Sequence, residues 1–459
     1  MINLIVLILF FLFVFYKRKK PINKYLFLAF IFKLIATISV WYIYTYYYSD
    51  TSLNDIYKYF NDGNYLYKKF LQTPSETIQF VLDGSISENT KALSNKLLFW
   101  TKPNQYGLLN DNQTIILLNF FLCFLSNSNL LIQSLLISSI SFYATYKLYE
   151  TLKNHFSVPS RILFLFLFFN PSYLVWTSGN FKETFIYIGL MFLFSNLIRL
   201  IYRRNKMKLH LLIFINLIFI LFCKNYFFLF LTPGIFAIYI YLFLLKKENT
   251  KLISFSYLTF LLLIIFAGLF YNPVNFENKI KDPVKRKLYI KKINSDSYEK
   301  NALGENRNIF EVLRFKQRDQ QFEAKAQKAR SVIYAPTLDG DPITILRCVP
   351  FALFNAIFRP NIVDIKNVLF IPDFLLNLLL FIIILLSIFY KNHFLSSKEK
   401  LIQRFILCFA LMSLIIIGTL VPVLGNLVRY RAPILPLFTL VILLRIDFKK
   451  VPWLNKLQF

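Results

Sequence analysis

The sequence is poor in residues that bind metals and has no closely spaced cysteines. Its four cysteines are isolated in apolar surroundings without a CxxC spacing, and its three histidines lie beside Lys/Arg-rich connections. These residues are Cys123, Cys223, Cys348 and Cys408, and His155, His210 and His393. This pattern argues against the usual zinc sites and against a disulfide framework. No metal site is predicted, although a divalent cation held by carboxylates alone is compatible with the sequence.

The sequence also lacks the short motifs of several large enzyme classes. It contains no GxxxxGKS/T, no GxSxG and no HExxH, which argues against a cytosolic nucleotide-driven enzyme and a familiar hydrolase. Acidic residues are scarce, because 24 Asp and Glu stand against 53 Lys and Arg, for a formal charge of +29. The chain has no basic-aromatic module of a nucleic-acid binder. The excess positive charge therefore serves as a signal of membrane orientation, and no nucleic-acid partner is predicted.

Long apolar runs dominate what is present. Hydrophobic residues make up 56% of the 459 residues and aromatic residues 19%, with a mean hydropathy of +0.51. Such runs predict an all-α polytopic membrane protein. We expect eleven transmembrane helices, at Ile2–Tyr16, Tyr25–Tyr48, Leu130–Tyr146, Ile162–Trp176, Thr184–Ile201, Leu209–Cys223, Phe227–Leu245, Leu252–Tyr271, Leu369–Tyr390, Leu401–Val421 and Pro433–Leu444.

The hydrophilic stretches between these runs divide the chain into five parts. Two of them are long extracytoplasmic loops. The first contains an interfacial or re-entrant helix over Ile115–Leu125, and the second an amphipathic helix over Ile309–Ile333. The second loop ends in RCVPFALFNAIFRP, read as a short interfacial or re-entrant helix with Arg347 and Arg359 at its two ends. The parts are 1–48 (first two spans), 49–129 (first loop), 130–271 (central bundle), 272–360 (second loop) and 361–459 (C-terminal spans).

The short basic segments set the expected orientation. Six of them fall on one side of the predicted spans, as the positive-inside rule requires of cytoplasmic segments. They are Lys17–Lys20, Lys147–Arg161, Arg203–Lys208, Lys246–Lys251, Lys391–Arg404 and Arg445–Lys456. We therefore expect the N-terminus outside and the C-terminus in the cytoplasm.

A polar interruption, NPSYLVWTSGNFKET over Asn170–Thr184, lies between two apolar runs and faces outward in this topology. A charged pair within it, Lys182 and Glu183, must lie at a rim, in a cavity or against each other, because the bilayer core has no water. Two interpretations remain open. The stretch is either a simple turn, with Asn180 and Glu183 forming a capping box, or part of a functional site.

The outer side collects further candidate residues. An aspartate at an apolar rim can act as a general base, and the arginine fork suits bidentate contact with phosphate. The alternatives are ordinary solvated loop carboxylates and arginines that snorkel to the interface. The candidate catalytic residues are Asp55, Asp62 and Glu183, and the candidate lipid-phosphate ligands are Lys182, Arg347, Arg359, Arg429 and Arg431.

Four stretches together resemble bacterial polytopic envelope-polysaccharide proteins. These are the D-x(6)-D-G pattern of Asp55–Gly63, NPSYLVWTSGNFKE, PFALFNAIFRP and GNLVRYRAPILP. The layout is similar to O-antigen polymerase-like proteins and GT-C glycosyltransferases, which use polyprenyl-phosphate-linked sugars. The resemblance implies that Asp55 or Asp62 is the base and that Arg359, Arg429 and Arg431 contact the lipid diphosphate. The chain departs from the GT-C pattern because it lacks an adjacent acidic pair and its first loop follows the second span.

The expected function is a membrane glycosyltransferase or polysaccharide polymerase at the outer face of a bacterial inner membrane. Its partners would be a polyprenyl-(di)phosphate-linked saccharide, the bilayer and other polysaccharide-assembly proteins, with a divalent cation on carboxylates as the cofactor to consider. Two alternatives stay open. One is a transporter or flippase of lipid-linked saccharides, for which Lys33 and Asn119 are the polar residues within apolar stretches. The other is a non-catalytic assembly partner that docks through Ile309–Ile333.

Overall fold

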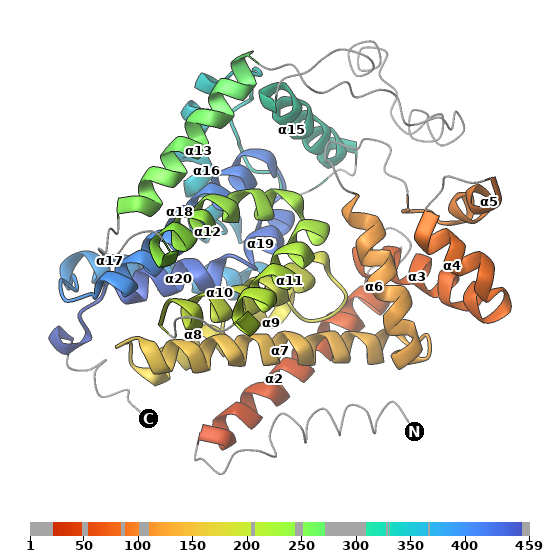
Figure 1. Ribbon diagram of the computed structural model, residues 1–459, viewed down its shortest axis with the longest axis horizontal. Coiled ribbons are helices and arrows are strands. Elements are labelled where there is room, and N and C mark those ends of the chain that lie inside the picture. The colour runs from red at the N-terminus through yellow and green to blue at the C-terminus, as the bar shows by residue number, and fades with distance from the viewer. Residues whose placement is uncertain are drawn as a thin grey trace.

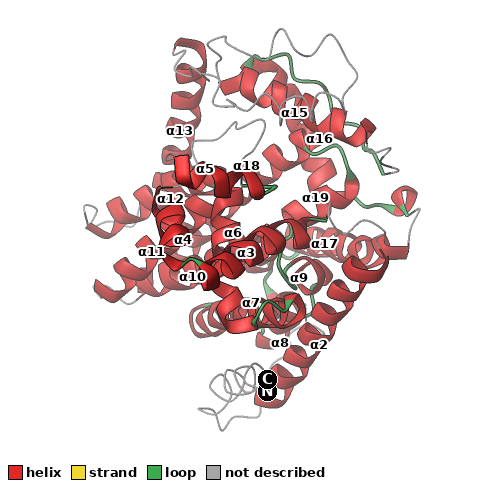
Figure 2. Cartoon of the chain, turned by 90° about the vertical axis from the view of Figure 1, so that its right-hand side faces the viewer, coloured by secondary structure: helices red, strands yellow, loops and turns green. Residues whose placement is uncertain are grey.

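The computed structural model describes residues 22–47, 54–83, 88–100, 110–202, 207–243, 251–270, 309–326, 329, 331–365 and 368–451. Of these residues 84% are helical, and the described chain contains no strand (Figure 2). Two isolated bridges, Val332 to Val423 and Lys391 to Ile446, are its only β-type pairings among the described residues. The predicted first span, Ile2–Tyr16, lies outside the described residues.

The helices follow one another with short connections through most of the described chain. The first half contains α2 (Ile22–Tyr42), α3 (Asp55–Gln72), α4 (Pro74–Asp83), α5 (Glu88–Lys96), α6 (Asp111–Ser126), α7 (Leu130–His155), α8 (Ser160–Phe168), α9 (Pro171–Trp176) and α10 (Lys182–Tyr202). The second half contains α11 (Met207–Cys223), α12 (Asn225–Phe243), α13 (Lys251–Phe270), α15 (Ile309–Ala326), α16 (Pro342–Phe358), α17 (Ile371–Phe389), α18 (Ser397–Leu420), α19 (Leu424–Arg431) and α20 (Leu435–Leu444). A π-helical turn at Ile43–Tyr47 extends α2.

Five of these helices are long and apolar enough to cross a membrane. They occupy Lys24–Tyr47, Lys182–Tyr202, Asn225–Leu242, Ile371–Phe389 and Ser397–Leu420. Two bent pairs, α6 with α7 and α19 with α20, raise the number to seven if each pair forms one span. The described chain is thus a helical protein with five to seven candidate spans, and the expected count of eleven is not confirmed.

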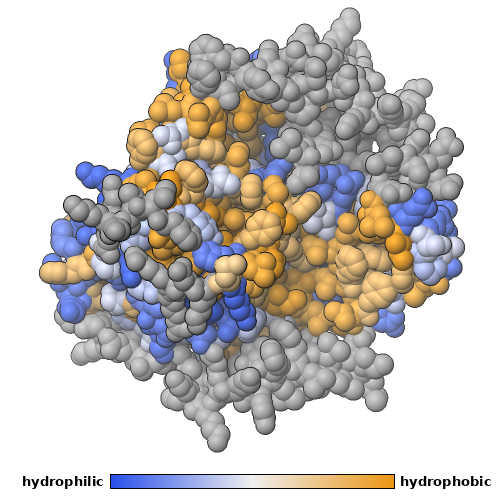
Figure 3. Space-filling view, viewed as in Figure 1, coloured by the Kyte–Doolittle hydropathy of each residue, from blue (hydrophilic) through white to orange (hydrophobic). Residues whose placement is uncertain are grey.

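Large apolar side chains are exposed on several of the outer helices. Phe32 and Ile35 on α2, Leu262 on α13, and Leu379 and Ile382 on α17 are all more than two-fifths exposed. Hydrophobic surface covers α13 and spreads across the middle of the face seen in Figure 3. So much apolar surface would be unfavourable in water. A lipid environment accounts for it.

The core is built where helices distant in sequence pack together. Helix α10 lies against α7 and α11, α2 packs on α7, and α16 packs on α18 (Figure 1). The last crossing needs a glycine, because a Cβ at Gly418 would lie 2.1 Å from the carbonyl oxygen of Ala352. The helices α3, α4 and α5 form a lobe at the opposite edge of the molecule from α13 and α17.

The predicted span Ile162–Trp176 is not one helix. It is divided into α8 and α9, with the break at Asn170-Pro171. The residue before a proline avoids the helical region, and proline itself fits the first turn of a new helix. Asn170 caps that turn, because its side chain accepts a hydrogen bond from the backbone N–H of Tyr173 at 3.3 Å.

The segment over Ile115–Leu125 is helical and belongs to α6. The chain turns by 106° between α6 and α7, at Asn127 and Ser128, whose φ values are 48° and 60°. Asparagine tolerates this left-handed conformation better than most residues. Helix α6 therefore folds back against the bundle at its outer edge, where it contacts α3, α7 and α11.

Two expectations for the second loop need correction. Helix α16 begins at Pro342, where Asp341 caps it by accepting from the N–H of Thr344 at 2.7 Å. Arg347 consequently lies inside the helix, whereas Arg359 is its C-cap. The amphipathic helix ends at Ala326, not at Ile333. Residues 331–341 are not helical, and the N–H of Ile333 donates to the carbonyl of Pro422 at 2.8 Å.

Candidate functional site

The start of α10 positions the charged pair that the sequence singles out. Residues 177–181, TSGNF, interrupt the helical path between α9 and α10. Gly179 has a φ of +108°, a conformation that side chains with a Cβ rarely adopt. This break lets α10 begin at Lys182, so that Lys182 and Glu183 occupy its first turn.

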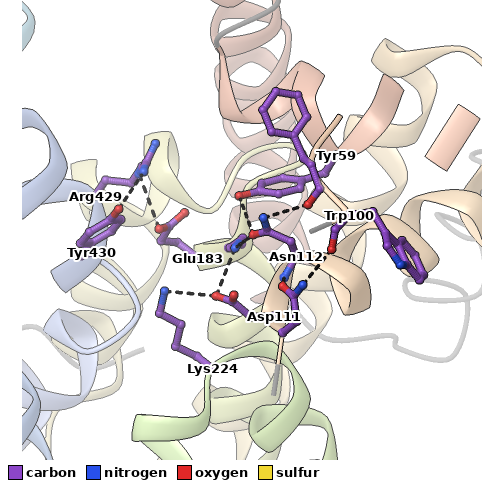
Figure 4. A network of polar contacts seen from close by, with 11 residues as sticks. Tyr59, Trp100, Asp111, Asn112, Glu183, Lys224, Arg429 and Tyr430 are labelled. Atoms are coloured by element: carbon purple, nitrogen blue, oxygen red, sulfur yellow. Dashed lines mark hydrogen bonds and ion pairs between the residues drawn. The ribbon is translucent and has the colours of Figure 1, made fainter. Parts of the chain in front are cut away.

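Lys182 points toward the start of α6. Its Nζ lies 3.1 Å from Oδ2 of Asp111 and donates to the side-chain oxygen of Asn112. Lys224, just before α12, approaches the same Asp111 oxygen at 3.4 Å (Figure 4). The Tyr59 ring lies 4.8 Å from the ammonium of Lys182, at a distance typical of a cation–π contact. One carboxylate therefore bridges a lysine of α10 and a lysine of the turn between α11 and α12.

Glu183 points toward α19 instead. Its Oε1 lies 3.5 Å from Nε of Arg429, and only 8% of its side chain is exposed. Arg429 also donates to the hydroxyl of Tyr430 at 3.4 Å (Figure 4). Lys224 lies 5.8 Å from the centre of the Tyr430 ring, so the Asp111 and Glu183 groups are neighbours. We call Asp111, Asn112, Lys182, Glu183, Lys224, Arg429 and Tyr430 the rim cluster.

A further cation, in the second loop, is influenced by the charge of the rim cluster. Lys316 lies on α15 and is half-buried. Burial and, to a smaller extent, the positive charges of Lys224 and Lys182 together lower its pKa to about 8. Lys316 is therefore within electrostatic range of both rim lysines.

The charge balance of this region favours an anion. Three cations, Lys182, Lys224 and Arg429, contact two carboxylates, Asp111 and Glu183. Cations held close together by a smaller number of carboxylates attract an anionic group and are already oriented for it. Arginine and lysine are the usual phosphate ligands in proteins. Chemically, the cluster can bind phosphate and offers a carboxylate beside it.

Four other predicted residues are placed differently. Asp62 is buried and its two oxygens accept the backbone N–H groups of Leu98 and Phe99 at 3.1 and 2.8 Å, so it ties α3 to the segment after α5. Arg347 lies on the exposed face of α16. Arg359 Nε lies 3.7 Å from the carboxylate of Asp364. Asp55 is the first residue of α3, and its side chain lies outside the described part.

Arg431 is fully buried although it is only two residues from Arg429. Its guanidinium donates to the carbonyls of Ala356 and Ile357 at 2.8 and 3.3 Å, and to the side-chain oxygen of Asn377 at 2.8 Å. These carbonyls belong to the end of α16, which has no further helical partners for them. Arg431 therefore joins α19 to α16 and α17. Of the predicted residues, the structure brings together Lys182, Glu183 and Arg429.

The interpretation of Asn180 and Glu183 as a capping box is wrong. The side-chain nitrogen of Asn180 donates to Asn119 and to the carbonyl of Ile56. Its Oδ1, the atom that would cap α10, is buried without a hydrogen-bond partner among the described residues. Glu183 forms an ion pair with Arg429, whereas a capping box would need it to accept the backbone N–H of Asn180. The turn is thus built into the protein interior and is not a solvated connection.

Sequence reasoning missed Asp111, Lys224, Lys316 and Tyr430. Asp111 had one signal, because an acidic residue in the first turn before an apolar run is typical of a helix start. Lys224 was visible as an isolated cation between two apolar runs. Among the described residues, no three His, Cys, Asp or Glu side chains form a metal-binding group. The divalent cation remains an untested expectation.

No family model, curated protein or solved structure matches the chain. Its function is therefore argued from the rim cluster alone.

Proposed function

We propose that the chain is a membrane glycosyltransferase or polysaccharide polymerase that uses polyprenyl-(di)phosphate-linked sugars. The observation that carries this proposal is the rim cluster, where three cations, Lys182 at the start of α10, Lys224 just before α12 and Arg429 of α19, contact two carboxylates. It sits at the ends of apolar helices, where a lipid phosphate would lie. In the proposed orientation this is the outer face of a bacterial inner membrane, with the N-terminus outside and the C-terminus cytoplasmic.

The cations would hold the leaving group. A phosphate entering between Lys224 and Arg429 would replace contacts that these residues now make with Asp111 and Glu183. Because the existing ion pairs already hold the cations in place, little reorganisation is needed when negative charge develops on the leaving phosphate. Lys316 would approach from α15, so the second loop would cover the site and exclude water.

A carboxylate freed by this exchange would act as the base. Glu183 is the better placed, since Arg429 is its ion-pair partner and would turn to the phosphate. The acceptor hydroxyl would attack the anomeric carbon as its proton passes to Glu183, and the sugar–phosphate bond would break with its electrons leaving on the (di)phosphate. Asp111 is the second candidate. Asp62 is excluded from this proposed role because its oxygens already hold two backbone N–H groups.

A transporter or flippase of lipid-linked saccharides is the second candidate function. It is favoured by the buried polar side chains Lys33, Asn119 and Gln133 within the apolar helices, since such residues often mark a substrate path. Each of them is instead held by hydrogen bonds within the protein, Gln133 to Asn119 at 2.5 Å and Lys33 to the Tyr173 carbonyl at 2.8 Å, which gives them a structural role. Enzymatic transfer at the rim therefore remains the preferred proposal.

The deciding experiment is a surface-polysaccharide gel from cells that depend on this protein, with membrane protein levels measured in parallel. We expect Arg429→Ala and Lys224→Ala to lower glycan synthesis by about 10²–10³-fold, as does the loss of other groups that stabilise transition-state charge. Lys68→Ala is the matched control, because Lys68 is exposed on α3. It should leave the glycan unchanged.

The form of the remaining glycan separates the candidate functions. A single repeat unit would indicate a polymerase, whereas a truncated unit would indicate a transferase. Complete lipid-linked saccharide accumulating on the inner leaflet would indicate a flippase. Normal glycan in both rim variants, at normal protein levels, would contradict the proposal.

A further inference from the structure

Lys33 is a lysine inside the protein and inside a candidate span. It lies in α2, its side chain is 0% exposed, and the span around it runs from Lys24 to Tyr47. A charged group in such a place is costly unless it is compensated by neighbouring dipoles or charges. The rim cluster does not use this residue, so another reason for its presence is needed.

The surroundings of the Lys33 ammonium consist of oxygens and one aromatic ring. Its Nζ donates to the backbone carbonyl of Tyr173 at 2.8 Å and to Oγ1 of Thr177 at 2.7 Å. The ring of Tyr173 lies 3.9 Å from the same nitrogen, close enough for a strong cation–π contact. No carboxylate lies against it in the described part of the chain. The carbonyl, the hydroxyl and the face of the ring all stabilise a positive charge, although none of them carries a formal negative charge.

This set of ligands is the kind that binds a free monovalent cation. Where a transmembrane helix is broken, the carbonyls at the end of a half-helix coordinate alkali cations, and rings of backbone carbonyls coordinate K⁺ in channels. Tyr173 lies in the short helix α9 and Thr177 is its C-cap, the first residue of the break over 177–181, whose backbone N–H also donates to the Tyr173 carbonyl at 3.3 Å. The negative end of the helix dipole adds to the attraction for a cation.

We propose that the Tyr173 carbonyl and the Thr177 hydroxyl form a monovalent-cation site, and that the tethered ammonium of Lys33 fills it in place of a free ion. An ammonium group and K⁺ are similar in size, so K⁺ is the ion that a shortened side chain would admit. This site stands apart from the proposed transfer reaction and does not depend on it.

The tethered cation stabilises the break that leads to α10. Thr177 Oγ1 also donates to the carbonyl of Tyr173 at 2.7 Å and accepts from Ser141 of α7 at 3.3 Å. Two residues further on, the N–H of Gly179 donates to Ser138 at 3.0 Å. Lys33 thereby fixes the end of α9 against α2 and α7. Lys33 is a positioning residue for the start of α10.

The test is thermal unfolding of the purified full-length protein in detergent, in KCl or in choline chloride at equal ionic strength. The wild type should give the same Tm in both salts. Lys33→Ala should unfold about 2–4 °C lower in choline chloride, because the Tyr173 carbonyl and the Thr177 hydroxyl each lose one of their buried donors. Increasing KCl should raise its Tm in a saturable way, and NaCl should be less effective.

Three further variants make the result specific. Lys33→Ala combined with Thr177→Val should lose the response to KCl, because the hydroxyl ligand is gone. Lys33→Met should have a lowered Tm without a K⁺ response, because its side chain fills the space without a charge. Lys24→Ala, on the exposed part of the same helix, should match the wild type. A Lys33→Met protein as stable as the wild type, or a Lys33→Ala protein indifferent to K⁺, would overturn the proposal.

Discussion

At the scale of single residues, Lys316 makes the rim cluster sensitive to pH. Its pKa of about 8 lies below the ordinary lysine value because of burial and the neighbouring Lys224 and Lys182. The side chain is charged below about pH 8 and becomes neutral above it, so an anion should bind more weakly as the pH rises. We expect the affinity for sulfate to be constant below about pH 8 and then to fall, by up to about tenfold per pH unit.

Sulfate is suitable as the probe because its own charge does not change between pH 6.5 and 9.5. The measurement is the sulfate-dependent shift in Tm over this range. Lys316→Arg should remove the pH dependence, since arginine stays charged. Lys316→Gln should bind sulfate weakly at every pH. The shift in Tm that remains in this variant measures the general stabilising effect of sulfate on proteins. The same fall in affinity in Lys316→Gln would show that another group titrates.

The rim cluster also shows what sequence could and could not predict at this scale. Lys182, Glu183 and Arg429 were predicted because charge is conspicuous beside apolar runs. Asp111 and Lys224 were not, because their importance comes from one contact across 113 positions of sequence. Arg429 and Arg431 looked equivalent in sequence, yet one faces Glu183 and the other is buried against α16. Helix periodicity alone did not indicate which arginine faces inward.

At the scale of elements, hydropathy predicted most helices but not their interruptions. Helix α18, at Ser397–Leu420, agrees closely with the predicted span Leu401–Val421. The predicted span Ile162–Trp176 failed because average hydropathy outweighed the Asn170-Pro171 signal. Beyond this break, buried polar side chains of α2 and α7 form hydrogen bonds with the backbone. These side chains are distant in sequence, so the hydrogen bonds depend on tertiary packing and could not be predicted from local sequence.

The break between α9 and α10 should depend on Gly179. Gly179→Ala places a Cβ at a φ of +108°, where its nearest neighbour, Ser134, is 3.6 Å away. The strain is therefore in the backbone and not in packing, and we expect a loss of about 1–2 kcal/mol in the free energy of unfolding. Thermal unfolding of the purified protein measures it. Gly425→Ala in α19 is the control, because nothing lies within 4 Å of its added Cβ.

The control should change in the opposite direction. An alanine in a helix costs less conformational entropy than a glycine, so Gly425→Ala should raise stability by about 0.5–1 kcal/mol. Equal losses in both variants would indicate a general effect of added side chains. They would contradict the role assigned to the left-handed conformation of Gly179.

At the scale of the whole molecule, α10 connects two chemically different ends. It runs for 21 residues, which corresponds to about 30 Å, the thickness of a bilayer core. Its first turn lies in the rim cluster, whereas its last residue, Tyr202, stacks on His155 of α7 at 4.3 Å. Lys398, at the start of α18, lies 5.4 Å from the same ring. Two of the basic segments predicted to share one side of the membrane, Lys147–Arg161 and Lys391–Arg404, therefore meet at the end of α10 opposite the rim cluster.

This arrangement predicts which residues an impermeant reagent can reach from outside the cell. In the proposed orientation the lobe of α3–α5 is extracytoplasmic and the end of α7 is cytoplasmic. A maleimide that cannot cross membranes should label Asn61→Cys in intact spheroplasts and label Lys153→Cys only after permeabilisation, since both residues are exposed. The wild type sets the background, because its four cysteines are buried or half-buried. The reverse labelling pattern would place the rim cluster in the cytoplasm, where a lipid-linked donor from the outer leaflet could not reach it.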